Sequence, residues 1–192
     1  MALAFTENER EEIESNLIQI AQDTLKTTSW KKIKVEDLAR SANISKGAFY
    51  HFYSSKEELF YDVMCKTHDE IYGKAMKCLY KKNMTPSEKI TQAIMQSIEA
   101  LQASGLWDFW ANDASSILSK IDSSRLIEQK KREGKVFRLF FETCGTLKVS
   151  EELAIHALQS LIQTSSFYLM YTKDYKKILK MMADGVCESI FD

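Results

Sequence analysis

The chain has 192 residues, 45% of them apolar, with one proline, six glycines and a net charge of −1. This length can bury one large core or two smaller ones, and the scarcity of turn-forming residues favours helices over strands. No apolar run approaches the ~20 residues that cross a bilayer and the acidic N-terminus is unlike a signal peptide, so a cytoplasmic protein without a membrane partner is expected.

The N-terminal residues predict a first helix, and the first 56 residues show a charge asymmetry. Thr6 to Glu9 has the T-x-x-E spacing of a capping box, so a helix is expected to begin there. Residues 1–23 carry a net charge of −5, whereas residues 24–56 carry seven basic and two acidic residues, a net charge of +5. A basic window on a nearly neutral chain is typical of a DNA-docking surface, although a solvated charged face gives the same pattern.

The next stretch predicts two short helices joined by a tight turn. Residues 35–42 have the apolar spacing of a helix, Asn43 suits a left-handed turn, and Ser45 is a suitable N-cap for a helix that runs to about Phe52. Helices under roughly 12 residues are marginal in isolation and need neighbouring elements to hold them. Presenting one such helix to the DNA major groove is the best-known use of this arrangement.

Helices are also predicted for the rest of the chain. A serine at position 54 or 55 caps a long helix that runs to about Tyr80, and Pro86 suits the first position of the helix after it. The further predicted helices span residues 86–103, 106–120, 123–144, 150–171 and 174–191. The predicted fold class is therefore all-α, with about nine helices.

Four short segments occur at fixed spacing: LA at 38–39, NISKG at 43–47, FYHF at 49–52 and SKEEL at 55–59. With that spacing, residues 10–70 resemble the TetR family of transcriptional regulators, and the remainder is similar to the family in length and helical layout only. The resemblance implies a DNA-binding domain at residues 1–55, built as a three-helix helix-turn-helix. It also implies a helical ligand-binding and dimerisation domain at residues 56–192.

The third predicted helix has an apolar face at Phe49 and Phe52, and its other face is small and polar. Such a surface suits a major groove about 12 Å wide. The outward positions are Ser45, Lys46, Gly47, Ala48, Tyr50 and His51. By the resemblance, Tyr50 and Lys56 hold phosphates. The positions that the resemblance places near base edges are Lys46, Ala48 and His51.

Four positions in this region differ from the family pattern. Ser29 stands where the family commonly has glycine, and Asn43 stands at another frequent glycine. Ile33 and Lys34 replace the threonine or serine that usually caps the second helix. Lys34 is therefore expected to contact a phosphate through its charge instead.

One such DNA-reading unit is too small for strong specific binding, so a homodimer is expected. The last two helices spread apolar residues over more than one stripe, which calls for a second partner surface, although ordinary intrachain core gives a similar pattern. In the resembled family this helix pair forms a four-helix bundle across a two-fold axis. The residues expected at the dimer interface are Leu158, Leu161, Ile162, Ser165, Leu179, Met182 and Val186.

The middle of the chain is rich in aromatic residues, and small-molecule pockets are mostly apolar. By the resemblance, an effector binds among these helices and changes the spacing of the two DNA-reading units; plain core packing is the alternative. The residues expected to contact the ligand are Trp107, Trp110, Phe137, Phe141, Phe167 and Tyr171.

No pattern of catalytic residues is found. The three histidines are isolated, and neither a Gly-rich phosphate loop nor a nucleophile elbow occurs, so no enzyme, metal or cofactor is expected. The four cysteines are scattered without a CxxC pair, which favours reduced thiols. The expected function is a homodimeric repressor that binds operator double-stranded DNA and is released by a small apolar or aromatic effector. An activator of the same fold, and a helical protein-interaction module that does not bind DNA, are the alternatives.

Overall fold

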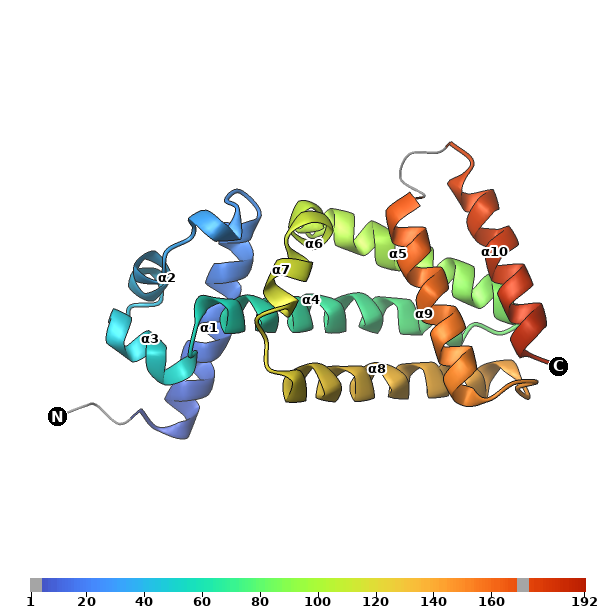
Figure 1. Ribbon diagram of the computed structural model, residues 1–192, viewed down its shortest axis with the longest axis horizontal. Coiled ribbons are helices and arrows are strands. Elements are labelled where there is room, and N and C mark those ends of the chain that lie inside the picture. The colour runs from blue at the N-terminus through green and yellow to red at the C-terminus, as the bar shows by residue number, and fades with distance from the viewer. Residues whose placement is uncertain (1–4, 169–172) are drawn as a thin grey trace. The chain divides into compact units, whose positions relative to one another are not determined.

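The computed structural model describes residues 5–168 and 173–192, with side chains up to residue 164 and again from residue 173 (Figure 1). Over these ranges the regular elements are helices, joined by one isolated bridge between Leu147 and Phe191. The all-α prediction is therefore confirmed. The contacts divide the chain into two compact units, Met1–His68 with Ser104–Leu126, and Asp69–Ala103 with Ile127–Asp192.

The first unit begins with the helices that the sequence predicted. The capping box is present, because the Thr6 hydroxyl accepts from the Glu9 N–H at 3.4 Å and the Glu9 carboxylate accepts from the Thr6 N–H at 2.8 Å. The elements of this region are α1 (Glu7–Leu25), the short 3-10 helix η1 (Trp30–Lys32), α2 (Val35–Ser41), α3 (Lys46–Phe52) and the first half of α4 (Lys56–Leu79). The bounds of α2, α3 and α4 and the start of α1 lie within two residues of the predicted ones, and η1 was not predicted.

Two short helices, α6 (Trp107–Asn112) and α7 (Ala114–Leu118), complete the first unit. The sequence predicted a single helix at residues 106–120, and that prediction is wrong. The helix breaks at Asp113, whose φ of −117° departs from helical geometry and whose carboxylate lies 3.8 Å from Lys31 Nζ. Aspartate has a low helix propensity, because its side chain competes for backbone hydrogen bonds. This break raises the number of described α-helices to ten, where about nine were expected.

The segment 104–126 shares the core of the N-terminal helices. Trp30 meets Phe60 edge-on, with ring centroids 6.2 Å apart, and Phe60 lies 6.3 Å from Phe109 of α6. All three rings are buried. The compact units are thus not the two domains expected from the sequence, and the functional boundary between residues 55 and 56 stays a prediction.

The second unit contains the rest of α4 together with α5 (Pro86–Ala103), α8 (Ser123–Cys144), α9 (Glu151–Tyr168) and α10 (Tyr175–Ile190). Helices α5, α9 and α10 pack against one another (Figure 1). Residues 146–148 hold the end of the chain, since the Asp192 N–H donates to the Thr146 carbonyl at 3.0 Å and the Lys148 N–H to that of Ile190 at 2.9 Å. In the described ranges we find no helix with a stretch long and apolar enough to span a bilayer.

The four cysteines, all within the described residues, form no disulfide, and two of them, Cys78 and Cys187, are buried. Burial raises the pKa of Cys78 and Cys144, and it raises the pKa of Cys187 to about 12. Reactive cysteines need a stabilised thiolate, so these three side chains act as small apolar residues of the core.

Candidate nucleic-acid interface

The turn between α2 and α3 fixes the direction of α3. Asn43 has the expected left-handed conformation, with φ of 56°, and its N–H donates to the Arg40 carbonyl at 3.1 Å. The Ile44 N–H donates to the Ala39 carbonyl at 2.9 Å, so two of the carbonyls in the last turn of α2 are satisfied. Ser45 then caps α3, because its hydroxyl accepts from the Ala48 N–H at 3.0 Å. Both capping predictions are confirmed.

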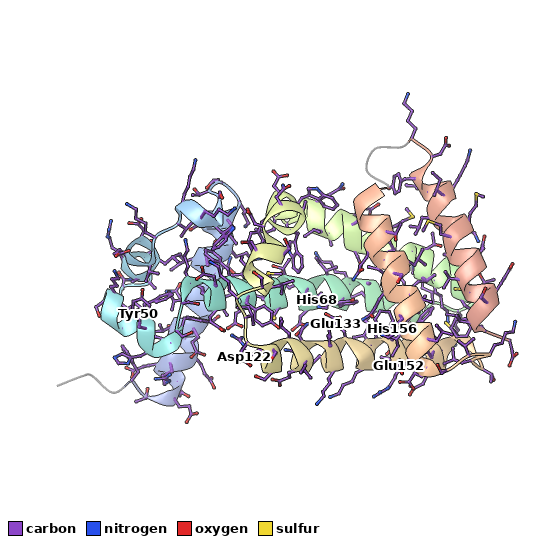
Figure 2. All side chains as sticks on the ribbon, in the orientation of Figure 1. Tyr50, His68, Asp122, Glu133, Glu152 and His156 are labelled. Carbon is purple, nitrogen blue, oxygen red and sulfur yellow. The ribbon has the colours of Figure 1, made fainter. Side chains whose placement is uncertain are left out.

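Phe49 anchors α3 to the core. Its side chain is fully buried, and its ring meets Tyr50 edge-on with centroids 5.5 Å apart and lies 5.8 Å from Tyr53. Burial of this one side of the helix turns the neighbouring positions outward, and Tyr50 is 50% exposed (Figure 2). Of the residues predicted to contact DNA on α3 and its cap, those exposed are Ser45, Lys46, Gly47, Tyr50 and His51, with Ala48 partly exposed.

The C-terminal turn of α3 is held by α1. Phe52 is only partly buried, with its ring 5.6 Å from Phe5 and 5.0 Å from the Arg10 guanidinium. Arg10 Nη2 also donates to the His51 carbonyl at 3.4 Å. A cation suits this negative end of the helix dipole. Arg10 was not predicted, because no local pattern links α1 to residue 51.

Gly47 lies in the first turn of α3, where packing within the described chain does not require a glycine. A Cβ added there meets only the Ser45 hydroxyl, at 3.7 Å, which is ordinary contact. The missing side chain therefore leaves space on the outer surface of α3, where another molecule can approach the backbone closely.

Lys56, which the family resemblance assigns to a phosphate, has internal partners. Its ammonium donates to the carbonyls of Trp30, Lys31 and Ile33 at 3.1, 3.3 and 3.1 Å, and it lies 5.0 Å from the centre of the Trp30 ring. An ammonium has three N–H donors, so all of them are engaged. Lys56 thus ties the η1 turn to α4, and a phosphate contact would have to replace one of these hydrogen bonds.

Lys56→Met is expected to lower the free energy of unfolding by about 1–2 kcal/mol, because two partly buried carbonyls, those of Trp30 and Ile33, lose a charged donor. Urea unfolding measures this loss. Lys66→Met is the matched control on the same helix, since the hydrogen bond described for Lys66 goes to exposed Gln19, at 2.9 Å. A Lys56 variant as stable as the control but weaker in DNA binding would instead support the phosphate role.

Arg125, at the start of α8 but in the first unit, is the centre of a charged cluster with α4. Its guanidinium pairs with Glu58 and Asp62 and lies 4.8 Å from the centre of the Tyr61 ring. The Tyr61 hydroxyl donates to the Arg125 carbonyl at 3.2 Å. Burial alone would lower the pKa of Arg125, but Asp62 and Glu58 together raise it. Burial, followed by the charge of Asp62, also raises the pKa of Tyr53, the residue that ends α3.

Two further ion pairs join the segment 104–126 to the N-terminal helices. Lys120 Nζ lies 2.7 Å from the Glu57 carboxylate and 5.3 Å from the centre of the Trp30 ring, and Lys31 pairs with Asp113. The start of α4 is therefore held by the charges of Lys120 and Arg125, and η1 by that of Asp113. No local pattern predicts these partners, which lie more than 60 residues away along the chain.

The residues predicted to contact a ligand fall into different parts of the structure. Trp107 and Trp110 belong to the first unit, and the buried Trp110 Nε1 has no hydrogen-bond partner. Phe137 and Phe141 are buried in the second unit, where Phe141 packs on Phe140 and Phe191. The Phe167 side chain and Tyr171 lie outside the described residues.

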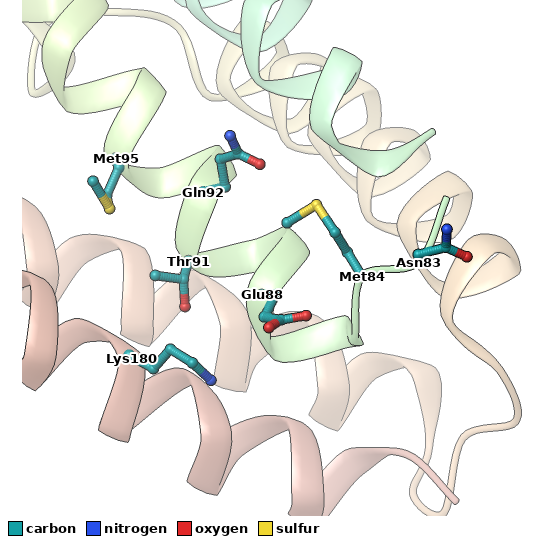
Figure 3. Close-up of a pocket in the computed structure, with 7 residues that line it drawn as sticks. All are labelled: Asn83, Met84, Glu88, Thr91, Gln92, Met95 and Lys180. Carbon is teal, nitrogen blue, oxygen red and sulfur yellow. The ribbon is translucent and has the colours of Figure 1, made fainter. Parts of the chain in front are cut away.

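The second unit contains a hollow of about 370 Å³ that is largely open to solvent (Figure 3). It lies between the start of α5 and α10. Its lining residues are Asn83, Met84, Glu88, Thr91, Gln92, Met95 and Lys180, none of which the sequence predicted. No three His, Cys, Asp or Glu side chains gather as a metal site in the part of the chain that the structure describes.

The predicted dimer residues are a mixture of buried and accessible positions. Leu158, Leu161 and Leu179 are at most 3% exposed within the single chain, so they have no surface left for a second copy to cover. These three belong to the intrachain core, as the alternative interpretation held. Those that are partly exposed are Ile162, Met182 and Val186, while the Ser165 side chain lies outside the described residues. The large apolar side chains exposed on α9 and α10 are Leu153, Ile178 and Met181.

Comparisons with known proteins agree with this geometry. Residues 21–63 match the family model for bacterial regulatory proteins of the tetR family. The HTH-type transcriptional repressor KstR2 of Mycolicibacterium smegmatis is 28% identical over 117 residues, which are 61% of this chain and 57% of that repressor. The chain thus aligns with little more than half the length of this curated relative.

Two solved structures have the same fold. A TetR transcriptional regulator from a Rhodococcus species has 14% identity and a TM-score of 0.64, with 93% of this chain and 97% of that chain covered. The regulator FadR from Bacillus subtilis, solved in complex with stearoyl-CoA, has 13% identity and a TM-score of 0.62, with 92% and 98% covered. At these identities the similarity is one of fold.

Proposed function

The chain belongs to the TetR family of bacterial regulatory proteins, and from this we propose that it is a sequence-specific, DNA-binding transcriptional regulator. In this proposal it acts in the cytoplasm as a homodimeric repressor, with residues 1–55 as the DNA-binding domain and residues 56–192 as the ligand-binding and dimerisation domain. The observation that carries the proposal is the orientation of α3. Phe49 is fully buried, while Ser45, Lys46, Tyr50 and His51 are exposed.

The exposed face of α3 suits insertion into a major groove. Its residues are small or polar, and Gly47 leaves room for close approach of the backbone. Tyr50 is proposed to bind a phosphate through its hydroxyl, and exposed Lys34, at the start of α2, to do so through its charge. Lys46, Ala48 and His51 are proposed to lie near base edges, where contacts specify sequence.

A small apolar or aromatic effector is proposed to release the DNA. Support comes from the aromatic residues of the middle helices and from the FadR fold relative, which was solved with stearoyl-CoA. Trp110 offers an unpartnered indole N–H to a ligand oxygen. Such a ligand regulates only if it binds one of two conformations more tightly.

Tyr50 substitutions test the assignment of the interface. Loss of a hydrogen bond to a charged group costs about 1.5–3 kcal/mol, so Tyr50→Phe should weaken duplex binding about 10- to 100-fold, at every sequence tested. The phenylalanine keeps the ring contact with Phe49, so the fold should be unchanged. Fluorescence anisotropy with a labelled duplex measures the affinity.

Tyr80→Phe is the matched control, because Tyr80 is 62% exposed in the other compact unit. It should bind DNA as the wild type does. Equal affinity of the Tyr50→Phe variant and the wild type would mean that the Tyr50 hydroxyl holds no phosphate. Failure of the wild type to bind any duplex would overturn the proposed function itself.

A further inference from the structure

Lys46 occupies an electrostatically unfavourable position. It is the first residue of α3, directly after the Ser45 cap, where the partial positive charge of the helix dipole disfavours a cation. A lysine at this place needs a nearby anion or a phosphate to offset the repulsion.

Glu36 of α2 supplies that anion. Its carboxylate accepts a hydrogen bond from Lys46 Nζ at 2.5 Å, across the turn of the helix-turn-helix. The hydrogen bond from Lys46 lowers the pKa of Glu36, and the same bond raises the pKa of Lys46. Both side chains are about half exposed, so the pair lies on the surface that the proposed function turns toward DNA.

The pair changes what the α3 surface offers to a phosphate. A lysine that neutralises a phosphate releases counterions, and this contact takes place at any DNA sequence. While Lys46 stays paired with Glu36, its charge is cancelled and its reach is limited by α2. Hydrogen bonding to a base edge needs only one of its remaining donors.

We propose that Glu36 is a specificity-determining, positioning residue of the DNA interface, which holds Lys46 away from the phosphates and so limits binding to non-cognate sequences. This inference rests on the proposed function. Glu36 acts through Lys46, and it touches no other part of α3 by a hydrogen bond or ion pair among those described.

The experiment measures binding of the full chain to a random-sequence duplex of about 30 base pairs, long enough for two half-sites one helical turn apart. Glu36→Gln frees one phosphate-binding lysine, so the slope of log affinity against log salt should steepen by about 0.9 for each DNA-reading unit that contacts the duplex. Between about 50 and about 200 mM salt, its affinity should then fall about three- to four-fold more than that of the wild type for each such unit.

Two controls separate this effect from a general loss of negative charge. Asp37→Asn removes the neighbouring carboxylate of α2, whose partner is Arg40 at 3.1 Å, and it should leave the slope nearer to that of the wild type. In a Lys46→Gln background, Glu36→Gln should have no further effect on the slope, because the residue through which it acts is gone.

Three results would overturn the inference: an unchanged slope in Glu36→Gln, an equal change in Asp37→Asn, or a Glu36→Gln effect that persists without Lys46. Each leaves the proposed function standing, because the wild type still binds the duplex. Thermal unfolding of every variant should match the wild type, since exposed ion pairs contribute little to stability.

Discussion

Replacing Phe49 with alanine is expected to lower the free energy of unfolding by about 3–5 kcal/mol and to abolish DNA binding at physiological temperature. Phe49 is fully buried and packs between Tyr50 and Tyr53. The seven residues of α3 are too few to be helical alone, so the helix depends on the packing of the Phe49 side chain. Since whole domains are stable by only about 5–15 kcal/mol, this loss is a large fraction of the total.

Circular dichroism on heating measures the effect. For a chain of this size, a loss of about 3–5 kcal/mol corresponds to a fall of roughly 6–20 °C in the melting temperature. Tyr50→Ala is the matched control, because it removes the adjacent aromatic ring, which is half exposed. It should weaken DNA binding with a much smaller change in melting temperature. Equal shifts in the two variants would contradict the inward orientation of Phe49.

The second large effect is expected at Arg125. Arg125→Met leaves Glu58 and Asp62, one turn apart on α4, as like charges without their cation. The expected loss is about 1–2 kcal/mol, below that of a fully buried pair because the Arg125 side chain is 36% exposed. Since the Asp62 carboxylate interacts with Tyr53, the residue that ends α3, DNA affinity should fall as well.

Urea unfolding and duplex binding measure the two consequences. Arg138→Met is the matched control, because Arg138 pairs with Glu151 at 2.5 Å with both side chains well exposed, and it should change stability by less than about 0.5 kcal/mol. Neutralising Glu58 and Asp62 in the Arg125→Met background should restore most of the lost stability. If Arg125→Met costs no more than Arg138→Met, the cluster does not hold the start of α4.

The helix-turn-helix could be predicted from sequence because each of its signals is local. The Thr6 capping box, the left-handed Asn43 and the Ser45 cap act within four residues of where they stand, so their spacing in the sequence is their spacing in space. The buried Phe49 follows from helical periodicity once the ends of α3 are known.

The contacts that hold η1 and the start of α4 could not be predicted, because they join distant parts of the chain. Lys56 matched a family position, but its hydrogen bonds go to carbonyls 23 to 26 residues away. Arg125 meets Glu58 from 67 residues away. The sequence shows that each of these residues is basic, and only the fold decides which atoms it contacts.

The apolar faces of the helices were predicted correctly, but the surfaces that cover them were not. Leu158 and Leu179 have the same hydropathy as residues of a dimer interface, yet they are covered by their own chain. Phe137 and Trp110 were expected to contact a ligand because of their aromatic character and the family resemblance, and they belong to different compact units. Periodicity identifies a buried side of a helix and carries no information about the partner.

Selection from a randomised duplex library with the purified full chain tests the central claim, that α3 reads DNA sequence. We predict enrichment of one short motif, arranged as two half-sites related by two-fold symmetry, and a change of that motif in Lys46 or His51 variants. Tyr50→Ala should reduce recovery of all sequences alike. A wild-type protein that enriches no sequence, or a motif that is unchanged when Lys46, Tyr50 and His51 are all replaced, would contradict the account.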